Sequence, residues 1–342
     1  MTPNPPRDSL PRQQPTIVTP RAEAGYRSVT WVGHSTVLLQ IGPLNVLTDP
    51  VWSERASPVQ WIGPRRVMTP AIDFDELPPV DVVLLSHNHY DHLDATTVRR
   101  IARCFPDATW LCPLGLPYLL KRFGVRNIAE RDWWQSVTEA RFTATCTPAQ
   151  HFSARGLRDR NETWLCPLGL PHLLERFGVR NIAERDWWQS VKEAQFTATC
   201  TPAQHFSARG LRDRNETLWC GWVIEADSVR VFFAGDTALN PSLEDIGGLL
   251  GPFDLVMLPI GAYEPRWFMR AVHMNPEDAV AAYRALVNGP ATPPCFAIHW
   301  GTFRLTDEPV DEPPQRFARS WGDARLPERA NWTLAHGETR RF

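Results

Sequence analysis

A short apolar run that ends in a cluster of metal-binding side chains constrains this chain more than any other feature. Residues 80–85 are almost continuously apolar, as in a buried strand, and the sequence SHNHYDH follows at once. His87 and His89 lie two residues apart, so in extended chain both point to the same side. Because an open catalytic site takes about three protein ligands and a water, these two with Asp91 and His92 can begin two adjacent sites.

The alternative is a chance cluster on a solvated loop. It is disfavoured because the cluster follows a buried strand, at the place where α/β sheets present their sites. Other residues of ligand type also follow apolar strands: Asp236 comes after residues 231–235, and His299 after residues 295–298. His151 and His205 each follow the sequence TPAQ. Singly each could be an ordinary polar residue, but jointly they complete a set for two metals.

Part of the chain is present twice. Residues 110–163 recur almost letter for letter as residues 164–217, an offset of 54 residues. The copies differ only at the pairs Tyr118/His172, Lys121/Glu175, Thr138/Lys192 and Arg141/Gln195. One copy accounts for 54 of the 342 residues, and the remaining 288 suit one large α/β domain with a deep core. Two copies do not make a solenoid, so one is surplus to the fold.

The order of the predicted elements indicates a two-sheet core with helices outside. We expect a Pro-rich disordered tail over residues 1–25 and one domain over residues 26–342. Asn275 and Pro276 are an N-cap and first helical residue, and the helix should run to about residue 287. The predicted strands are 30–33, 35–40, 45–49, 80–85, 109–116, 142–147, 218–225, 229–234, 255–259, 295–299 and 332–335, and the other helices are 95–104, 117–123 and 314–321.

Composition limits the partners and the compartment. The formal net charge is −2, which gives no electrostatic reason to expect a nucleic-acid partner. No run approaches the ~18 apolar residues that span a bilayer, and the N-terminus lacks the apolar segment of a signal peptide. None of the seven Cys forms a Cys-x-x-Cys pair, so buried thiols in a reducing compartment are expected. The sequence therefore favours a cytoplasmic protein.

The motifs SHNHYDH, PAQH, FAGDT and AIHWGTF, in that order, resemble those of the metallo-β-lactamase superfamily. The stretches GAYEPRWFM (261–269), HMNPE (273–277) and DRN (213–215) make the chain resemble, more narrowly, the N-acylphosphatidylethanolamine-hydrolysing phospholipase D family. The likeness covers about residues 29–338. It implies a four-layer αββα sandwich that holds two zinc ions, although mixed His and carboxylate ligands also suit iron or manganese.

The resemblance also assigns roles. His87, His89 and the His of PAQH (His151 or His205) would hold one zinc, and Asp91, His92 and His299 the other. Asp236 would bridge the two, with a shared hydroxide. Apart from the resemblance, Asp91 is also a candidate to relay a proton, as a carboxylate beside the nucleophile, and His273, just before the capped helix, is a catalytic candidate that would support a ligand or bind phosphate. Tyr263 and Arg266 are candidates for substrate contact, and Asp49 for support of the ligands. His34 reads as a core histidine and His336 as a surface residue.

We therefore expect a zinc-dependent phosphodiesterase of phospholipase D type that acts on N-acylphosphatidylethanolamine or a related glycerophosphodiester through the metal-bridging hydroxide. The alternatives are a lactonase or sugar-phosphate lactone hydrolase with the same site, and a pseudoenzyme, damaged by the duplication, that only binds metal. A phospholipid substrate implies peripheral membrane contact. A surplus copy with exposed aromatic residues would favour a homodimer. His205 is preferred to His151 because the second copy runs directly into the strand at 218–225.

Overall fold

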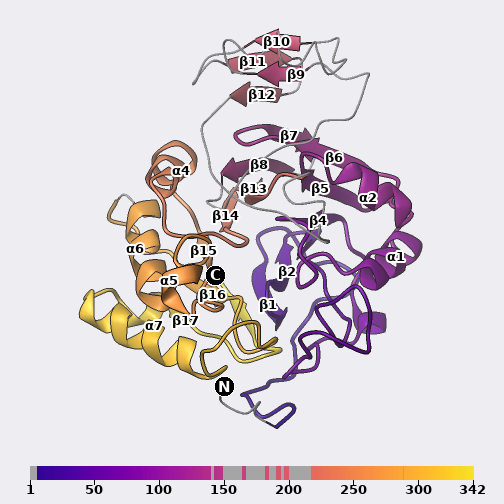
Figure 1. The fold of residues 1–342 in the computed structure, drawn as a ribbon. Coiled ribbons are helices and arrows are strands. Elements are labelled where there is room, and N and C mark those ends of the chain that lie inside the picture. The colour runs from indigo at the N-terminus through magenta and orange to yellow at the C-terminus, as the bar shows by residue number, and fades with distance from the viewer. Residues whose placement is uncertain are drawn as a thin grey trace.

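The structure, a computed structural model, describes residues 6–139, 142–148, 164–166, 182–184, 190–193, 196–199, 217–287 and 289–342. Two seven-stranded sheets form its centre (Figure 1). The first has the order β18-β1-β2-β3-β4-β5-β6. Its strands are β1 (Arg27–Gly33), β2 (Thr36–Ile41), β3 (Leu44–Thr48), β4 (Val82–Leu84), β5 (Thr109–Pro113), β6 (Ile128–Arg131) and β18 (Thr339–Arg341). The predicted meander is β1 to β3, and β3 to β6 pair in parallel.

The second sheet has the order β17-β16-β15-β14-β13-β8-β7. Its strands are β7 (Ser136–Glu139), β8 (Phe142–Pro148), β13 (Cys220–Ala226), β14 (Val229–Phe233), β15 (Leu255–Pro259), β16 (Cys295–Ile298) and β17 (Asn331–Trp332). The strands β14 to β17 pair in parallel, whereas β7, β8, β13 and β14 pair antiparallel. The carboxyl ends of β14, β15 and β16 therefore meet at one edge.

Helices lie outside both sheets. The first sheet is covered by α1 (Ala95–Cys104) and α2 (Pro117–Arg122), and the second by α4 (Ser242–Leu250), α6 (Pro276–Leu286) and α7 (Glu312–Asp323) (Figure 1). Shorter elements are α5 (Arg266–Met269), η1 (Phe74–Glu76) and η2 (Glu328–Ala330). This is the four-layer αββα arrangement that the sequence predicts. Among the described residues, no helix is long and apolar enough to cross a bilayer.

The alternation of side chains explains the layers. In β2, Val37 and Leu39 belong to the core between the sheets, whereas Leu38 packs with Val98 and Ile101 of α1. The first sheet is apolar on both faces and so needs helices on its outer side. A sheet with one face in water would expose half of these apolar side chains to solvent.

The N-terminal segment lies against the domain from residue 6 onward. The Gln13 N–H donates to the His336 carbonyl at 2.8 Å. The side chain of Gln40 accepts the Val18 N–H at 3.0 Å and donates to the Val18 carbonyl at 2.7 Å. The structure thus differs from the disordered tail that we predicted, over the part it describes. Composition suggests disorder here because the segment has few apolar residues, but its backbone hydrogen bonds are supplied by distant parts of the chain.

In the described strands, the second copy of the repeat pairs as the first does. The β5–β6 pair places Trp110 opposite Ile128, and the pair β9 (Trp164–Cys166) and β10 (Ile182–Glu184) places Trp164 opposite Ile182. Likewise β11 (Ser190–Glu193) pairs with β12 (Phe196–Thr199) in the register of β7 with β8. Only the first copy extends the two main sheets; the second forms two separate two-stranded sheets (Figure 1). Local sequence therefore determines the pairing, but not which copy enters the sandwich.

Candidate metal centre

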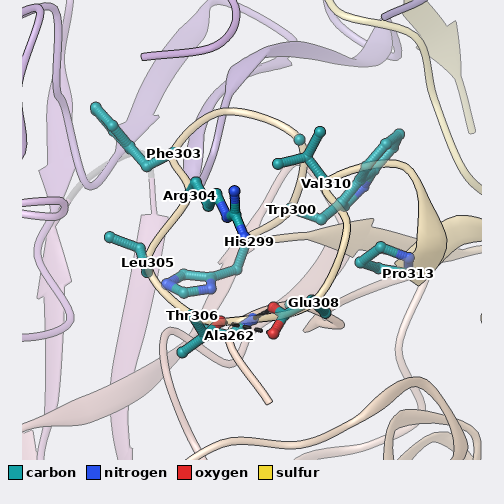
Figure 2. Close-up of a pocket in the computed structure, with 12 residues that line it drawn as sticks. Ala262, His299, Trp300, Phe303, Arg304, Leu305, Thr306, Glu308, Val310 and Pro313 are labelled. Carbon is teal, nitrogen blue, oxygen red and sulfur yellow. Dashed lines mark hydrogen bonds between the residues drawn. The ribbon is translucent and has the colours of Figure 1, made fainter. Parts of the chain in front are cut away.

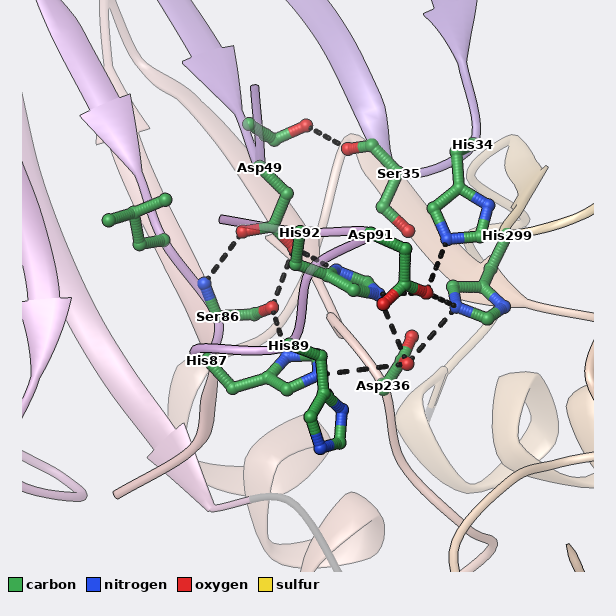
Figure 3. Close-up of polar contacts among 12 residues, drawn as sticks. His34, Ser35, Asp49, Ser86, His87, His89, Asp91, His92, Asp236 and His299 are labelled. Atoms are coloured by element: carbon green, nitrogen blue, oxygen red, sulfur yellow. Dashed lines mark hydrogen bonds and ion pairs between the residues drawn. The ribbon is translucent and has the colours of Figure 1, made fainter. Parts of the chain in front are cut away.

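The site is built from residues that follow strands. Asp49 follows β3, the sequence from Ser86 to His92 follows β4, Asp236 follows β14, and His299 follows β16. Because β3 and β4 are parallel, as are β14, β15 and β16, their carboxyl ends present these side chains together. Figure 3 shows the side chains converging between the two sheets.

Two carboxylates and two imidazoles form the centre of the cluster. The His92 Nε2 lies 3.1 Å from the Asp236 Oδ2 and 3.4 Å from the Asp91 Oδ2. The His299 Nε2 lies at the same two distances, 3.1 and 3.4 Å, from the same oxygens. Four ligand-type atoms from three separate segments thus surround one point, as the sequence predicts for the second metal.

His87 and His89 lie on the other side of Asp236. The His87 Nε2 is 2.8 Å from the His89 Nδ1 and 3.9 Å from the Asp236 Oδ2. Their rings are nearly perpendicular, at 82°. Asp236 is therefore the residue between the two pairs of histidines, which is the position expected of a bridging carboxylate.

Asp49 and Ser86 orient the ligands from behind. The Asp49 Oδ2 accepts from the His92 Nδ1 at 2.6 Å and from the Ser86 hydroxyl at 2.6 Å. Because that serine proton is used, its oxygen is the acceptor for the His87 Nδ1 at 2.9 Å. Both imidazoles then carry their proton on Nδ1 and direct Nε2 towards Asp236. Asp49 thus occupies the supporting role predicted for it.

Burial and mutual contact set the charge of the cluster. Burial would raise the pKa of Asp236, yet His299, His92 and His273 hold that pKa well below its ordinary value. Burial would lower the pKa of His299, but Asp236 and Asp91 raise it to about 9. Without a metal, protonated imidazoles balance the buried carboxylates. A bound cation would take over that role and leave the imidazoles neutral.

The donor set fits a metal ion. The His92 Nε2, the His299 Nε2 and the Asp236 Oδ1 are buried and form no hydrogen bond within the described part of the chain. A buried polar atom without any partner costs about 1–3 kcal/mol, which applies most directly to the Asp236 Oδ1, because the two imidazole nitrogens have the Asp236 Oδ2 at 3.1 Å. A divalent cation would satisfy all three, and imidazole and carboxylate ligands suit zinc, iron and manganese. The residues that would hold one or two such ions are His87, His89, Asp91, His92, Asp236 and His299.

A small pocket adjoins the cluster, with His299 in its wall (Figure 2). The Glu308 carboxylate accepts the backbone N–H of Ala262 at 2.7 Å and of Glu264 at 3.1 Å, which fixes the loop after β15. A Cβ on Gly261 would lie 2.2 Å from the His299 carbonyl oxygen. The loop therefore packs directly on the backbone of a metal-ligand residue, and only glycine permits that approach.

Comparisons with known proteins agree with this geometry. A family model described as the beta-lactamase superfamily domain matches residues 44–170 and again residues 158–300. The chain is 36% identical over 294 residues to N-acyl-phosphatidylethanolamine-hydrolyzing phospholipase D 1 of Caenorhabditis elegans, covering 84% of this chain and 68% of that protein. It is 37% identical over 312 residues to an uncharacterized protein of Mycobacterium tuberculosis, covering 91% of this chain and 68% of that protein. Igni18, a metallo hydrolase of Ignicoccus hospitalis, has a TM-score of 0.56 at 18% identity, over 92% of this chain and 98% of Igni18.

The chain belongs to the beta-lactamase superfamily. Within it, the chain belongs to the family of the N-acyl-phosphatidylethanolamine-hydrolyzing phospholipases D. The resemblance inferred from the motifs is thus confirmed, and so is the class of metal-dependent hydrolase. The family model matches twice because the chain contains a repeated segment: the first match ends, and the second begins, close to the junction of the two copies.

The structure brings His273 to the metallo-β-lactamase site. Its Nδ1 is 3.9 Å from the Asp236 Oδ2, and its ring centre is 5.4 Å from that of His299. Burial lowers the pKa of His273 to about 4, with Asp236 opposing the shift, so the imidazole is neutral at pH 7. The structure thus places His273 beside the predicted ligands, and its catalytic or phosphate-binding role stays a prediction.

Tyr263 and Arg266, predicted to contact substrate, have other partners. The Tyr263 hydroxyl donates to the Glu312 carboxylate at 2.8 Å, so it faces α7 and not the histidines. The Arg266 guanidinium pairs with Asp278 and donates to the His273 carbonyl at 2.9 Å. Arg266 thus supports the backbone of a site residue. Tyr263 packs the loop against the helix.

His151 and His205 lie outside the described residues. For two other histidines the structure adds to one prediction and contradicts the other. His34 is buried as predicted, but its Nε2 is 2.9 Å from the Asp91 Oδ2, inside the site. The same sequence pattern that identified the ligand residues, a histidine directly after an apolar strand, also occurs at His34 and could have indicated its place in the site. His336 is not on the surface: it is fully buried, 3.1 Å from the Thr302 hydroxyl, and its ring centre lies 4.0 Å from that of Trp31.

Proposed function

We propose that this metal-dependent hydrolase is a phosphodiesterase of phospholipase D type, acting on N-acylphosphatidylethanolamine or a related glycerophosphodiester. The observation that carries the proposal is the pair of carboxylates, Asp91 and Asp236, held between His92 and His299. Two divalent cations there, which we propose to be zinc, would supply Lewis acidity for a phosphoryl group and lower the pKa of an attacking water. The name of the C. elegans relative supports the choice of substrate.

The side chains of the chain itself contribute positioning and proton transfer. Asp91 is the less buried of the two carboxylates, 12% exposed against 2% for Asp236, so it is the one that can exchange a proton with a substrate or solvent. His273, neutral at pH 7, can donate an N–H to a phosphoryl oxygen beside Asp236. Asp49 and Ser86 keep the ligand histidines in one tautomer throughout.

An exposed aromatic pair next to the site favours a lipid substrate. Trp267 and Phe268 on α5 are 85% and 62% exposed, and their rings are in contact. Arg266, at the start of the same helix, binds the backbone of His273. Large exposed aromatic residues beside a site are typical of a surface that enters the interface of a bilayer. We propose that the enzyme works in the cytoplasm and takes its substrate from a membrane in this way.

The test compares three substrates on purified protein that has been reconstituted with zinc. N-Acylphosphatidylethanolamine in vesicles, a water-soluble phosphodiester and an N-acylhomoserine lactone are assayed side by side. Release of phosphatidic acid and the N-acylethanolamine supports the proposal. Turnover of the lactone alone would make the chain a lactonase. Two bound metals with no turnover of any substrate would make it a metal-binding pseudoenzyme.

The metal content is a separate measurement. We expect close to two metal ions per chain in the wild type, and fewer in the variants His87→Ala and His299→Ala, since each removes an imidazole from one side of Asp236. Reconstitution with manganese or iron in place of zinc identifies the ion that supports turnover. A stoichiometry near zero after reconstitution would contradict the site itself.

A further inference from the structure

His34 occupies an unusual backbone conformation. It lies directly after β1 and has φ +57°, in the left-handed region that residues other than glycine seldom adopt. Such a conformation costs on the order of 1 kcal/mol or more, and it persists only where the surroundings impose it. Because glycine would adopt this conformation without that cost, the histidine side chain itself must have a function here.

The backbone of His34 is held on both sides. Its N–H donates to the Thr302 hydroxyl at 2.6 Å. Its carbonyl accepts from the Trp31 indole at 2.9 Å and from the His299 N–H at 3.1 Å. The residue is thus attached to the backbone of a metal-ligand histidine from the opposite sheet, so its Cα has a defined place relative to the site.

The side chain is as well fixed as the backbone. His34 is 1% exposed, and its ring centre lies 4.0 Å from that of His299 and 5.3 Å from that of Phe303. Its Nε2 is 2.9 Å from the Asp91 Oδ2 (Figure 3). An ionised carboxylate only accepts hydrogen bonds, so the imidazole carries its proton on Nε2 and donates it.

We propose that His34 is a positioning residue, whose Nε2–H holds the Asp91 carboxylate in the orientation that a metal between His92 and His299 requires. A carboxylate oxygen has two lone pairs, so the Asp91 Oδ2 can accept a hydrogen bond from His34 and still face a metal ion. That ion would lie on the side of the His92 and His299 Nε2 atoms, each 3.4 Å from the Asp91 Oδ2. The relation mirrors that of Asp49 to His92, with the carboxylate now as the ligand and the imidazole as its support.

Two substitutions separate positioning from packing. In His34→Gln the amide nitrogen reaches about as far along the side chain as Nε2 does, so the donor to Asp91 is retained. In His34→Asn the nitrogen reaches only as far as Nδ1, so the donor is lost. Asparagine is among the residues that best tolerate the left-handed region, so His34→Asn keeps the turn. The thermal midpoint of each metal-free variant reports folding separately.

The readout is Zn²⁺ affinity at the two sites, measured by competition with a chelating dye. We expect His34→Asn to weaken one of the two sites by about 10- to 100-fold, as is typical when a support of a metal ligand is removed, and His34→Gln to stay within a few-fold of wild type. This readout needs no substrate, so it stands even if the proposed phosphodiesterase activity fails. With an active substrate, kcat should fall in His34→Asn more than KM changes.

Two results would overturn the inference. Equal Zn²⁺ affinity in wild type and His34→Asn would show that the contact with Asp91 does not position it. Loss of one bound ion in both variants would show that His34 coordinates the metal directly through Nε2. A failure of His34→Asn to fold leaves the comparison of wild type with His34→Gln, in which a loss of affinity of tenfold or more contradicts the proposal.

Discussion

The Nδ1 nitrogen of His92 lies 2.6 Å from the Oδ2 oxygen of Asp49, and both side chains are fully buried. This contact determines which nitrogen of His92 is left for a metal. Both carboxylate oxygens of Asp49 accept hydrogen bonds, one from the Ser86 N–H and the other from the His92 Nδ1–H. In Asp49→Asn the amide NH₂ must replace one of these oxygens, so in either orientation a donor faces a donor. We expect a loss of Zn²⁺ affinity of about 10- to 100-fold by dye competition.

The matched control is Asp75→Asn, at a side chain that is 90% exposed. It should leave the affinity and the thermal midpoint unchanged, because an exposed ion pair contributes little. Full affinity in Asp49→Asn would show that the His92 tautomer does not depend on Asp49.

Gly261→Ala should damage the site through the backbone. The added Cβ would lie 2.2 Å from the His299 carbonyl oxygen, and backbone cannot yield as a flexible side chain can. We expect a lower thermal midpoint, by several degrees, and weaker metal binding, since His299 must shift. In Gly248→Ala, on α4, the new Cβ meets nothing within 4 Å, so this variant should be neutral or slightly more stable. Unchanged metal affinity in Gly261→Ala would show that His299 tolerates the shift.

The double variant Trp267→Ser/Phe268→Ser should separate lipid access from chemistry. Each aromatic that enters a bilayer interface contributes on the order of 1–2 kcal/mol, so kcat/KM on vesicles should fall at least about tenfold. Turnover of a water-soluble phosphodiester should not change. Leu249→Ser, which removes an apolar side chain that is 62% exposed on α4, is the control and should behave as wild type on both. Equal loss on both substrates would assign the aromatic pair to the site and not to membrane contact.

The two repeat copies can be distinguished by their histidines. The sequence favours His205, but β8 of the first copy, the strand that leads towards His151, occupies the place beside β13. We now expect His151→Ala to remove about one bound metal per chain and His205→Ala to leave both. The reverse result would place the second copy in the site. Small and equal losses of bound metal in both variants would mean that either copy can supply the histidine ligand to the site.

A pH dependence should follow from His336. Burial, with Arg66 and Arg12 nearby, lowers the pKa of His336 to about 3, whereas in the unfolded chain it is about 6.5. Between these values the unfolded chain binds the extra proton. The free energy of unfolding should therefore be highest above pH 6.5, and it should decrease as the pH falls from 6.5 towards 3.

The measurement compares urea unfolding of metal-free wild type and His336→Gln at pH 7 and pH 5. Wild type should lose about 2 kcal/mol more than the variant over this interval, by proton linkage at about 1.4 kcal/mol per pH unit. The other histidines are present in both proteins, so their contributions to the pH dependence cancel in the difference. Equal losses would show that His336 does not titrate on unfolding.

The sequence by itself predicted most of the strands, the capped helix and the candidate ligand residues, but not β6, β7, β18 or the helix α4. These features depend on near neighbours: apolar runs end in His87, Asp236 and His299, and Asn275 closes a capping box with Asp278 only three residues away. The pairing within each repeat copy is also local, since the same letters give the same register. Such patterns repeat wherever the same short sequence occurs, so they can be read without the rest of the chain.

The tertiary structure alone decided the partners of single side chains. The contact of His34 with Asp91 spans 57 residues, and that of Tyr263 with Glu312 spans 49. It also decided which copy joins the sheets. In the first copy the differing residues Tyr118, Lys121 and Thr138 are all exposed, so the core does not distinguish the two sequences. Contacts of this kind depend on how the sheets pack, because each partner is chosen by position in space, and no short stretch of sequence carries that information.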